Sequence, residues 1–172
     1  MSIVKTVLQD GTKTAVVHWA FTSDGSDITN AGEMSGLVLL DPTADLTGVD
    51  NKIQLIITQV WYGFSWFDMS LAFDDITGNP LFILQLPRDA QNYMDLRYFG
   101  GLKDRTSTNV PSQAPNTQLG QPAPFPTPSQ DVVFTSRTPT GKILATTNGY
   151  AQLGSQGHLI LEVKKNQMYG TV

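Results

Sequence analysis

Alternation of apolar and polar residues is the sequence feature that most constrains how this chain can fold. It is clearest over residues 68–74, where Met69, Leu71 and Phe73 fall on one side and the residues between them on the other. A period of two residues is typical of a β-strand with one buried face. No apolar period of 3.6 residues persists for three turns, so we expect any helix to be short.

Several other runs are rich in β-branched and aromatic residues and are separated by turn-forming residues. The ranges expected to contain strands are 3–8, 14–21, 37–40, 52–73, 81–86, 95–99, 131–135, 142–147 and 158–164. Asp10-Gly11 is suited to a hairpin turn between the first two, and Gly63 suggests a bend or bulge. Eight or nine short strands at this spacing predict an all-β, antiparallel sandwich or barrel.

Composition narrows the class of protein. The 172 residues include 40% hydrophobic ones, enough to bury a core, and carry a net charge of −4. This charge argues against direct nucleic-acid binding, which needs a basic surface. There is no cysteine, so disulfides and thiolate chemistry are excluded. The apolar runs are far shorter than the roughly 20 residues of a membrane span, and no export signal is expected.

A proline-rich strip interrupts the strand pattern. Residues 109–130 contain six prolines and no charged side chain, and proline cannot serve in a central strand. We therefore expect a β-domain formed by residues 1–108 and 131–172, with 109–130 as an extended arm or loop. Prolines at every second position favour a polyproline-like rod of roughly 28 Å over about nine residues. The contact residues predicted in it are Pro122, Pro124, Phe125, Pro126 and Pro128.

The purpose of this strip has more than one interpretation. A stiff, uncharged segment with one aromatic residue suits docking on another subunit, because stiffness lowers the entropy lost on binding. An excursion packed on its own domain and a disordered linker are the alternatives. No two of its prolines stand three residues apart, so a PxxP ligand is excluded.

Aromatic residues also cluster over 61–67. Trp61, Tyr62 and Trp66 are candidates for a platform on which a sugar or nucleobase stacks. Core filling or a subunit interface explains aromatic residues equally well. Trp61, Tyr62 and Trp66 are therefore also predicted contact residues for a partner protein.

No catalytic, cofactor or metal site is predicted. His18 and His158 lie in strand-like runs without a local nucleophile or orienting acid. Residues 24–27 lack the full ligand pattern of a calcium loop, and Asp74-Asp75 precedes a turn. Residues 100–103 lack the spacing of a phosphate-binding loop.

Five segments of the sequence resemble those of a known family. These are TVLQDGTKTAVVH at 6–18, VWYGFSWFDMSLAFD at 60–74, DLRYFGGLK at 95–103, ILATTNGYA at 143–151 and HLILEVKK at 158–165. Together they resemble small virion structural proteins of tailed bacteriophages.

This resemblance implies a non-enzymatic role without a cofactor. It points to a capsid cement, or decoration, protein on the outer surface of the virion, made in the cytoplasm of the host bacterium. The implied partners are the major capsid protein of the same phage and further copies of this chain, with no membrane or nucleic acid. A neck, tail-tube or baseplate subunit is one alternative. A carbohydrate-binding module that uses Trp61, Tyr62 and Trp66 is another.

Overall fold

The protein is an antiparallel all-β structure, as the alternation predicts. The computed structural model describes residues 2–25, 33–49, 53–76, 78, 80–104, 107–111, 132–136 and 138–167. Its strands are β1 (Ser2–Asp10), β2 (Thr14–Thr22), β3 (Leu37–Leu40), β4 (Ile53–Ser65), β5 (Asp68–Asp75), β6 (Leu81–Leu86), β7 (Ala90–Asp95), β8 (Leu102–Lys103), β9 (Ser107–Pro111), β10 (Val132–Ser136), β11 (Pro139–Asn148) and β12 (Gln156–Gln167). The two helical elements are short: α1 (Pro42–Asp45) and the 3₁₀ turn η1 (Arg97–Phe99).

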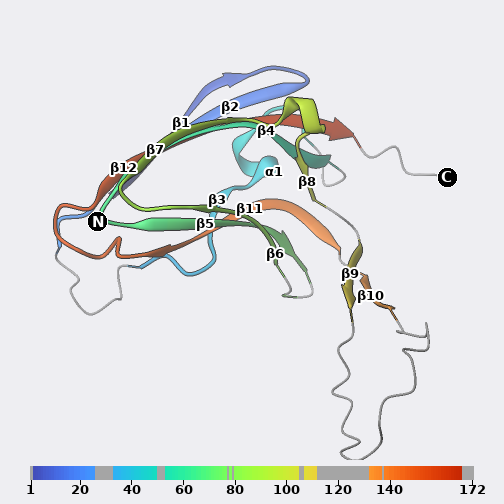
Figure 1. Cartoon of the computed structure of the whole chain (residues 1–172). Coiled ribbons are helices and arrows are strands. Elements are labelled where there is room, and N and C mark those ends of the chain that lie inside the picture. The colour runs from blue at the N-terminus through green and yellow to red at the C-terminus, as the bar shows by residue number, and fades with distance from the viewer. Residues whose placement is uncertain are drawn as a thin grey trace, which may run out of the picture.

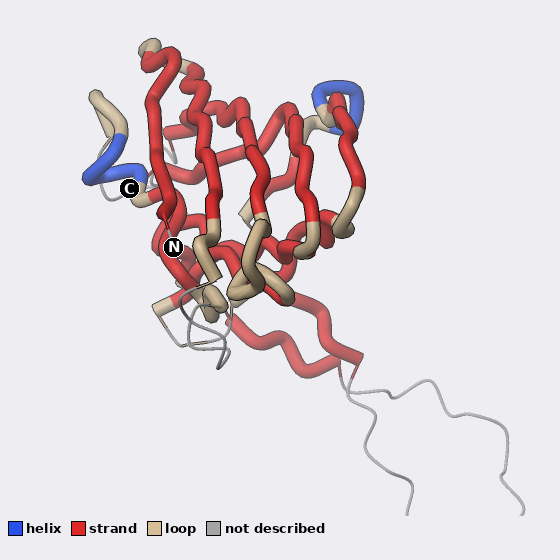
Figure 2. Tube along the Cα trace, turned by 90° about the vertical axis from the view of Figure 1, so that its left-hand side faces the viewer, coloured by secondary structure: helices blue, strands red, loops and turns tan. Residues whose placement is uncertain are grey.

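Two open sheets form a sandwich, which decides between the two expected architectures. The large sheet has the order β1-β2-β12-β4-β7, with β8 also pairing with β4, and the small sheet has the order β3-β11-β5-β6. Figure 1 shows the large sheet arching over the small one, and Figure 2 shows the strands of the large sheet side by side. A separate ribbon, β9 paired with β10, belongs to neither sheet.

The core lies between the sheets and is strongly aromatic. The rings of Phe21, Phe64, Phe67 and Tyr150 contact one another with centroids 4.6–6.1 Å apart. Trp19 Nε1 donates a hydrogen bond of 3.2 Å to the carbonyl oxygen of Leu39, which joins β2 to β3 across the core. Each such side chain contributes about 1.5–3 kcal/mol through burial. Aromatic packing therefore holds the two layers together.

Two details of the sequence interpretation are corrected. The strand expected at 95–99 is instead the end of β7 followed by η1, because the Asp95 carboxylate accepts a hydrogen bond of 3.1 Å from the Arg97 amide and turns the chain. Gly63 is not a bulge: it pairs in register with residues of both neighbouring strands. The bulge in β4 lies at Thr58, whose hydroxyl donates to the carbonyl oxygen of Glu162 over 3.1 Å.

The segment between β2 and β3 also contributes to the core through its described residues. Met34 is buried, and the Glu33 carboxylate accepts hydrogen bonds from Thr147 Oγ1 (2.7 Å) and the Ala151 amide (3.0 Å). Burial acts to raise the pKa of Glu33, but these hydrogen bonds outweigh it and leave the pKa below its ordinary value. Residues 26–32 of this loop lie outside the described residues.

A buried ion pair ties the end of β1 to the end of β12. The Lys165 side chain is only 2% exposed, and its ammonium contacts Asp10 Oδ1 and donates to the Thr47 carbonyl oxygen over 2.7 Å. Asp10 Oδ2 accepts from the Thr47 amide (2.6 Å) and hydroxyl (2.8 Å). The hydrogen bond from Lys165, against a smaller effect of burial, lowers the pKa of Asp10 to about 2. All charged groups of this cluster are therefore partnered.

We expect the substitution Asp10→Asn to destabilise the protein by about 2–4 kcal/mol at pH 7, because it leaves the Lys165 ammonium buried without a counter-charge. A lowered folded-state pKa gives stability that is present above the ordinary pKa and lost as the pH falls from about 4 to about 2. The variant should lose part of that pH dependence. Urea unfolding at pH 7, 4 and 2.5 measures both effects.

The control substitution Lys5→Gln breaks the exposed pair with Asp45 and should lower the unfolding free energy by less than about 1 kcal/mol. Equal costs for the two variants would contradict the assignment.

Truncation of the two adjacent aromatic residues at the β4–β5 corner should change the unfolding free energy by very different amounts. Phe67 is fully buried, so Phe67→Ala should cost about 3–5 kcal/mol. Trp66 is 62% exposed and has φ of 73°, which a glycine adopts without strain. We expect Trp66→Gly to change the unfolding free energy by less than about 1 kcal/mol, as relieved strain offsets the added chain entropy. Thermal unfolding of both variants checks this contrast, and a large loss in Trp66→Gly would refute it.

Candidate functional site

The ends of the proline-rich strip are held by the β9–β10 ribbon. These strands pair antiparallel from Ser107–Ser136 to Pro111–Val132. Residues 109–111 of the strip thus form part of a strand, and residues 112–131 join the two ends. Figures 1 and 2 show the ribbon projecting away from both sheets. The predicted contact residues Pro122, Pro124, Phe125, Pro126 and Pro128 lie outside the described residues.

The aromatic run at 61–67 is divided between the two faces of β4. Tyr62 is buried, 4% exposed, whereas Trp61 lies on the outer face and stacks on Tyr93 of β7 with centroids 5.0 Å apart. Trp66 lies beyond the end of β4. The platform expected from Trp61, Tyr62 and Trp66 is therefore wrong as a single surface, since successive side chains of a strand point to opposite faces. Tyr93 takes the place expected for Tyr62.

A hydrogen-bond network centred on Gln59 supports the stacked pair. In the amide orientation that satisfies both of its ends, Gln59 Nε2 donates to Glu162 Oε2 over 3.0 Å. Its oxygen accepts from the Tyr93 hydroxyl (2.7 Å) and from Arg97 Nη2 (2.8 Å). Thr58 Oγ1 donates to the other oxygen of Glu162 over 2.7 Å. These bonds fix the position of the Tyr93 ring on the surface.

Arg97 and Asp95 form an ion pair beside this network. Arg97 Nε donates to Asp95 Oδ1 over 2.9 Å and Nη2 donates to Oδ2 over 2.5 Å. The hydrogen bond from Arg97 holds the pKa of Asp95 well below its ordinary range, and Asp95 in turn raises the pKa of Arg97. Both groups stay charged at all physiological pH values. The pair is solvent-exposed, so it orients η1 and contributes little to stability.

His18 and His158 are neighbours on the outer face of the large sheet. Their rings meet edge to face with centroids 6.5 Å apart. No group of three or more histidine, aspartate or glutamate side chains in the described part of the chain is placed to hold a metal ion. Neither histidine is hydrogen-bonded to a serine, threonine or aspartate of that part, so no catalytic arrangement is assembled around them there.

The remaining motifs considered in the sequence are the Asp74-Asp75 pair, residues 24–27 and residues 100–103. Asp74 Oδ2 accepts from the Thr140 hydroxyl over 2.9 Å, which places the Asp74-Asp75 pair at the mouth of a turn as expected. Asp24 is described, whereas Asp27 is not. Gly101 has φ of 76° and lies against the Ile57 carbonyl oxygen, and it leads the chain into β8.

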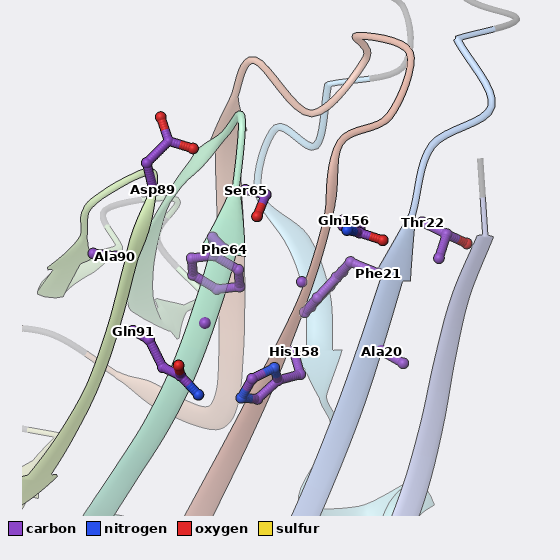
Figure 3. A pocket seen from close by; sticks show the side chains of 12 residues that line it. Ala20, Phe21, Thr22, Phe64, Ser65, Asp89, Ala90, Gln91, Gln156 and His158 are labelled. Carbon is purple, nitrogen blue, oxygen red and sulfur yellow. The ribbon is translucent and has the colours of Figure 1, made fainter.

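A groove of about 600 Å³ lies on the outer face of the large sheet, over one end of β2, β12, β4 and β7. Six polar residues line it: Thr22, Ser65, Asp89, Gln91, Gln156 and His158. We name it the Gly63 groove after the residue at its floor. Figure 3 shows the side chains of Gln91 and His158 pointing toward one another across β4, with Asp89 at the upper rim.

Gly63 has no side chain, and the His158 ring and the Gln91 side chain close over the space that a Cβ would occupy. A Cβ at this position would lie 2.7 Å from His158 Cε1 and 3.4 Å from Gln91 Cγ. Gly157 of the same groove is constrained from the other side, since its Cβ would lie 2.5 Å from Phe64 Cδ1 and 2.6 Å from the Gly63 carbonyl oxygen. Gly63 therefore leaves room for side chains of the groove, and Gly157 leaves room for the Phe64 ring in the core beneath it.

Sequence reasoning missed this groove and the residues that line it. Gly63 and His158 were each noticed alone, but only the register of β12 against β4 places them opposite one another. Asp89 and Gln91 lie in a polar segment, AQNYMD with its preceding turn, which has no strand-like alternation. Sequence patterns describe residues within one strand, whereas this groove is formed by residues from four strands.

Comparisons with protein-family models, with curated proteins and with solved structures found no match for this chain. Neither of the two helical elements in the described residues has the length and apolar character to cross a membrane.

The two glycines should differ sharply in their tolerance of a methyl group. Gly157→Ala should lower the unfolding free energy by about 1–3 kcal/mol, because the new atom meets backbone and the buried Phe64 ring. Gly63→Ala meets the end of the His158 side chain, which can rotate, and should stay within about 0.5 kcal/mol of the parent. Chemical denaturation of both variants measures the difference. A Gly157→Ala variant as stable as the parent would contradict this packing.

Proposed function

We propose that this chain is a non-enzymatic structural protein of a tailed-bacteriophage virion. In this proposal it is a capsid cement protein that lies on the outer surface of the shell and bridges neighbouring copies of the major capsid protein. The family resemblance of residues 6–18, 60–74, 95–103, 143–151 and 158–165 motivates it. A modest contact repeated over a closed lattice stabilises a shell without high affinity at any single site.

The observation that carries the proposal is the projecting β9–β10 ribbon. It holds the two ends of residues 112–131 together at Pro111 and Val132, away from the two sheets. Residues 112–130 of the segment between them carry no charged side chain, and proline recurs at every second position from 122 to 128. A proline-rich segment on a projecting ribbon is suited to contact a neighbouring subunit, because little entropy is lost when it docks.

Exposed aromatic residues add support for an interaction role. Tyr98 and Phe99 in η1 are 93% and 86% exposed, and Phe82 on the edge strand β6 is 60% exposed. Aromatic residues are enriched in protein interfaces. The low charge of the chain also suits a position outside the shell, away from packaged DNA.

Removal of the strip should abolish binding to the shell and leave the fold intact. Because Pro111 and Val132 are paired, residues 112–131 can be replaced by an Asn-Gly turn, which closes a two-residue hairpin. We expect the variant to keep the circular dichroism and melting temperature of the parent. Co-sedimentation with shells of the major capsid protein from the same phage should fall at least tenfold, or about 1.4 kcal/mol.

A variant of full length serves as the matched control. It carries serine at Pro122, Pro124, Phe125, Pro126 and Pro128, so it keeps the length of the strip and removes its stiffness and its aromatic ring. We expect it to bind as weakly as the deletion. Binding equal to that of the parent by both variants would overturn the role of the strip.

Electron cryo-microscopy of the same phage then tests the location. Density in many copies over the capsid exterior supports the cement proposal. Density confined to the portal, neck or tail overturns it and supports a ring-forming subunit instead.

A further inference from the structure

We propose that the Gly63 groove binds a short, neutral oligosaccharide. This inference goes beyond the structural role and does not depend on it, since it rests on the outer face of the large sheet and not on the ribbon. Of the platform residues Trp61, Tyr62 and Trp66, the proposed site shares Trp61 alone, at its far end, and Tyr62 is buried.

The polar lining of the groove is available for a ligand. The side chains of Thr22, Ser65, Gln91, Gln156 and His158 form no hydrogen bond with any described residue, although all five line one hollow. Hydroxyl, amide and imidazole groups both donate and accept hydrogen bonds, as the hydroxyl groups of a sugar do. The volume of about 600 Å³ lies within the range of small-molecule sites. The groove is therefore matched to a ligand rich in hydroxyl groups.

The charge of the groove disfavours anionic ligands. The described residues that line it include no lysine or arginine, and among them Asp89 supplies the one carboxylate. A phosphate or another anion would meet Asp89 without a compensating cation, which disfavours nucleotides. A carboxylate oxygen accepts hydrogen bonds from sugar hydroxyls without a need for opposite charge.

The position of the groove within the sheet argues against an extended peptide. Its floor strands are paired on both sides, β12 with β2 and β4, and β4 with β12 and β7. A peptide that adds to a sheet needs an unpaired strand edge. A ligand in this groove must therefore be bound by side chains, and a saccharide can be bound in this way.

Asp89, which lines the groove, and Trp66, which follows the lining residue Ser65, share an unusual backbone conformation. Trp66 (φ 73°) and Asp89 (φ 52°) are the only residues other than glycine with positive φ in the described chain. They are joined by a hydrogen bond of 2.8 Å from the Trp66 amide to Asp89 Oδ1. Strained residues cluster at binding sites, where the surrounding structure holds them. This bond fixes the Asp89 carboxylate at the groove, with Oδ2 unbonded among the described residues.

The stacked pair Trp61–Tyr93 extends the site along the sheet. Trp61 and Tyr93 lie two residues from Gly63 and Gln91 on the same strands and face, a distance of about 7 Å. Tyr93 is 44% exposed and held by the Gln59 network. A saccharide of two or three units would lie in the groove and reach this aromatic surface. Stacking of a sugar ring on an aromatic side chain would add to the hydrogen bonds.

Nuclear magnetic resonance titration of the full chain tests the proposal. The probes are maltotriose, cellotriose, lactose and N,N′,N″-triacetylchitotriose, each up to about 10 mM, and glycerol is the control for non-specific effects. We expect saturable shifts of the Gly63 and Gly157 amide signals with at least one of the four saccharides and none with glycerol. The expected dissociation constant is on the order of 1 mM, typical of an open polar site with few hydrogen bonds.

Matched variants separate the groove from the rest of the surface. Gln91→Ala, within the groove, should weaken binding about five- to tenfold, as expected for the loss of one hydrogen bond. Gln9→Ala, the same substitution at an exposed position of the edge strand β1, should bind like the parent. Gly63→Ala, which adds a methyl group to the floor, should weaken binding at least as much as Gln91→Ala.

Two results would overturn the proposal. One is the absence of shifts at both glycines with all four saccharides. The other is shifts that Gln91→Ala and Gly63→Ala leave unchanged. Neither result bears on the capsid experiment, so the two proposals fail separately.

Discussion

Burial of alternate side chains between the two sheets is the constraint on which the rest of this structure depends. Phe21, Phe64, Phe67 and Tyr150 form its aromatic centre. The period of two that brings Phe64 into the core also directs Gly63 to the outer surface. With no cysteine in the chain, the layers are held by packing and hydrogen bonding. The core therefore determines which residues are left for binding.

Structural and binding roles occupy different parts of the molecule. The inner faces and the Asp10–Lys165 pair stabilise the sandwich, and the outer face of the large sheet carries the Gly63 groove. The β9–β10 ribbon, outside both sheets, carries the ends of the proline-rich strip. A ligand on the outer face and a neighbouring subunit on the strip would contact separate surfaces. The two proposals are compatible for this reason.

Sequence analysis predicted much of the fold and little of the site. The first hairpin, the strand at 37–40 and the strands at 68–75 and 81–86 follow from β-branched residues, alternation and turns. The edge strand β7 was missed because AQNYMD is short and mixes polar and apolar residues on both faces, a pattern that an edge strand tolerates. Trp61 was identified as a candidate residue, but its partner Tyr93 and the groove beside it were not.

The sequence by itself determined the class of fold, the lack of long helices and the break at the proline-rich strip, since these depend on local periodicity and on proline chemistry. Only the tertiary structure decided between sandwich and barrel, paired Lys165 with Asp10, and brought Gly63, His158 and Gln91 together. These features depend on strand order and register, which contacts between distant segments set. A one-residue shift in register would reverse the face of every side chain in a strand, and no local pattern records that choice between partners.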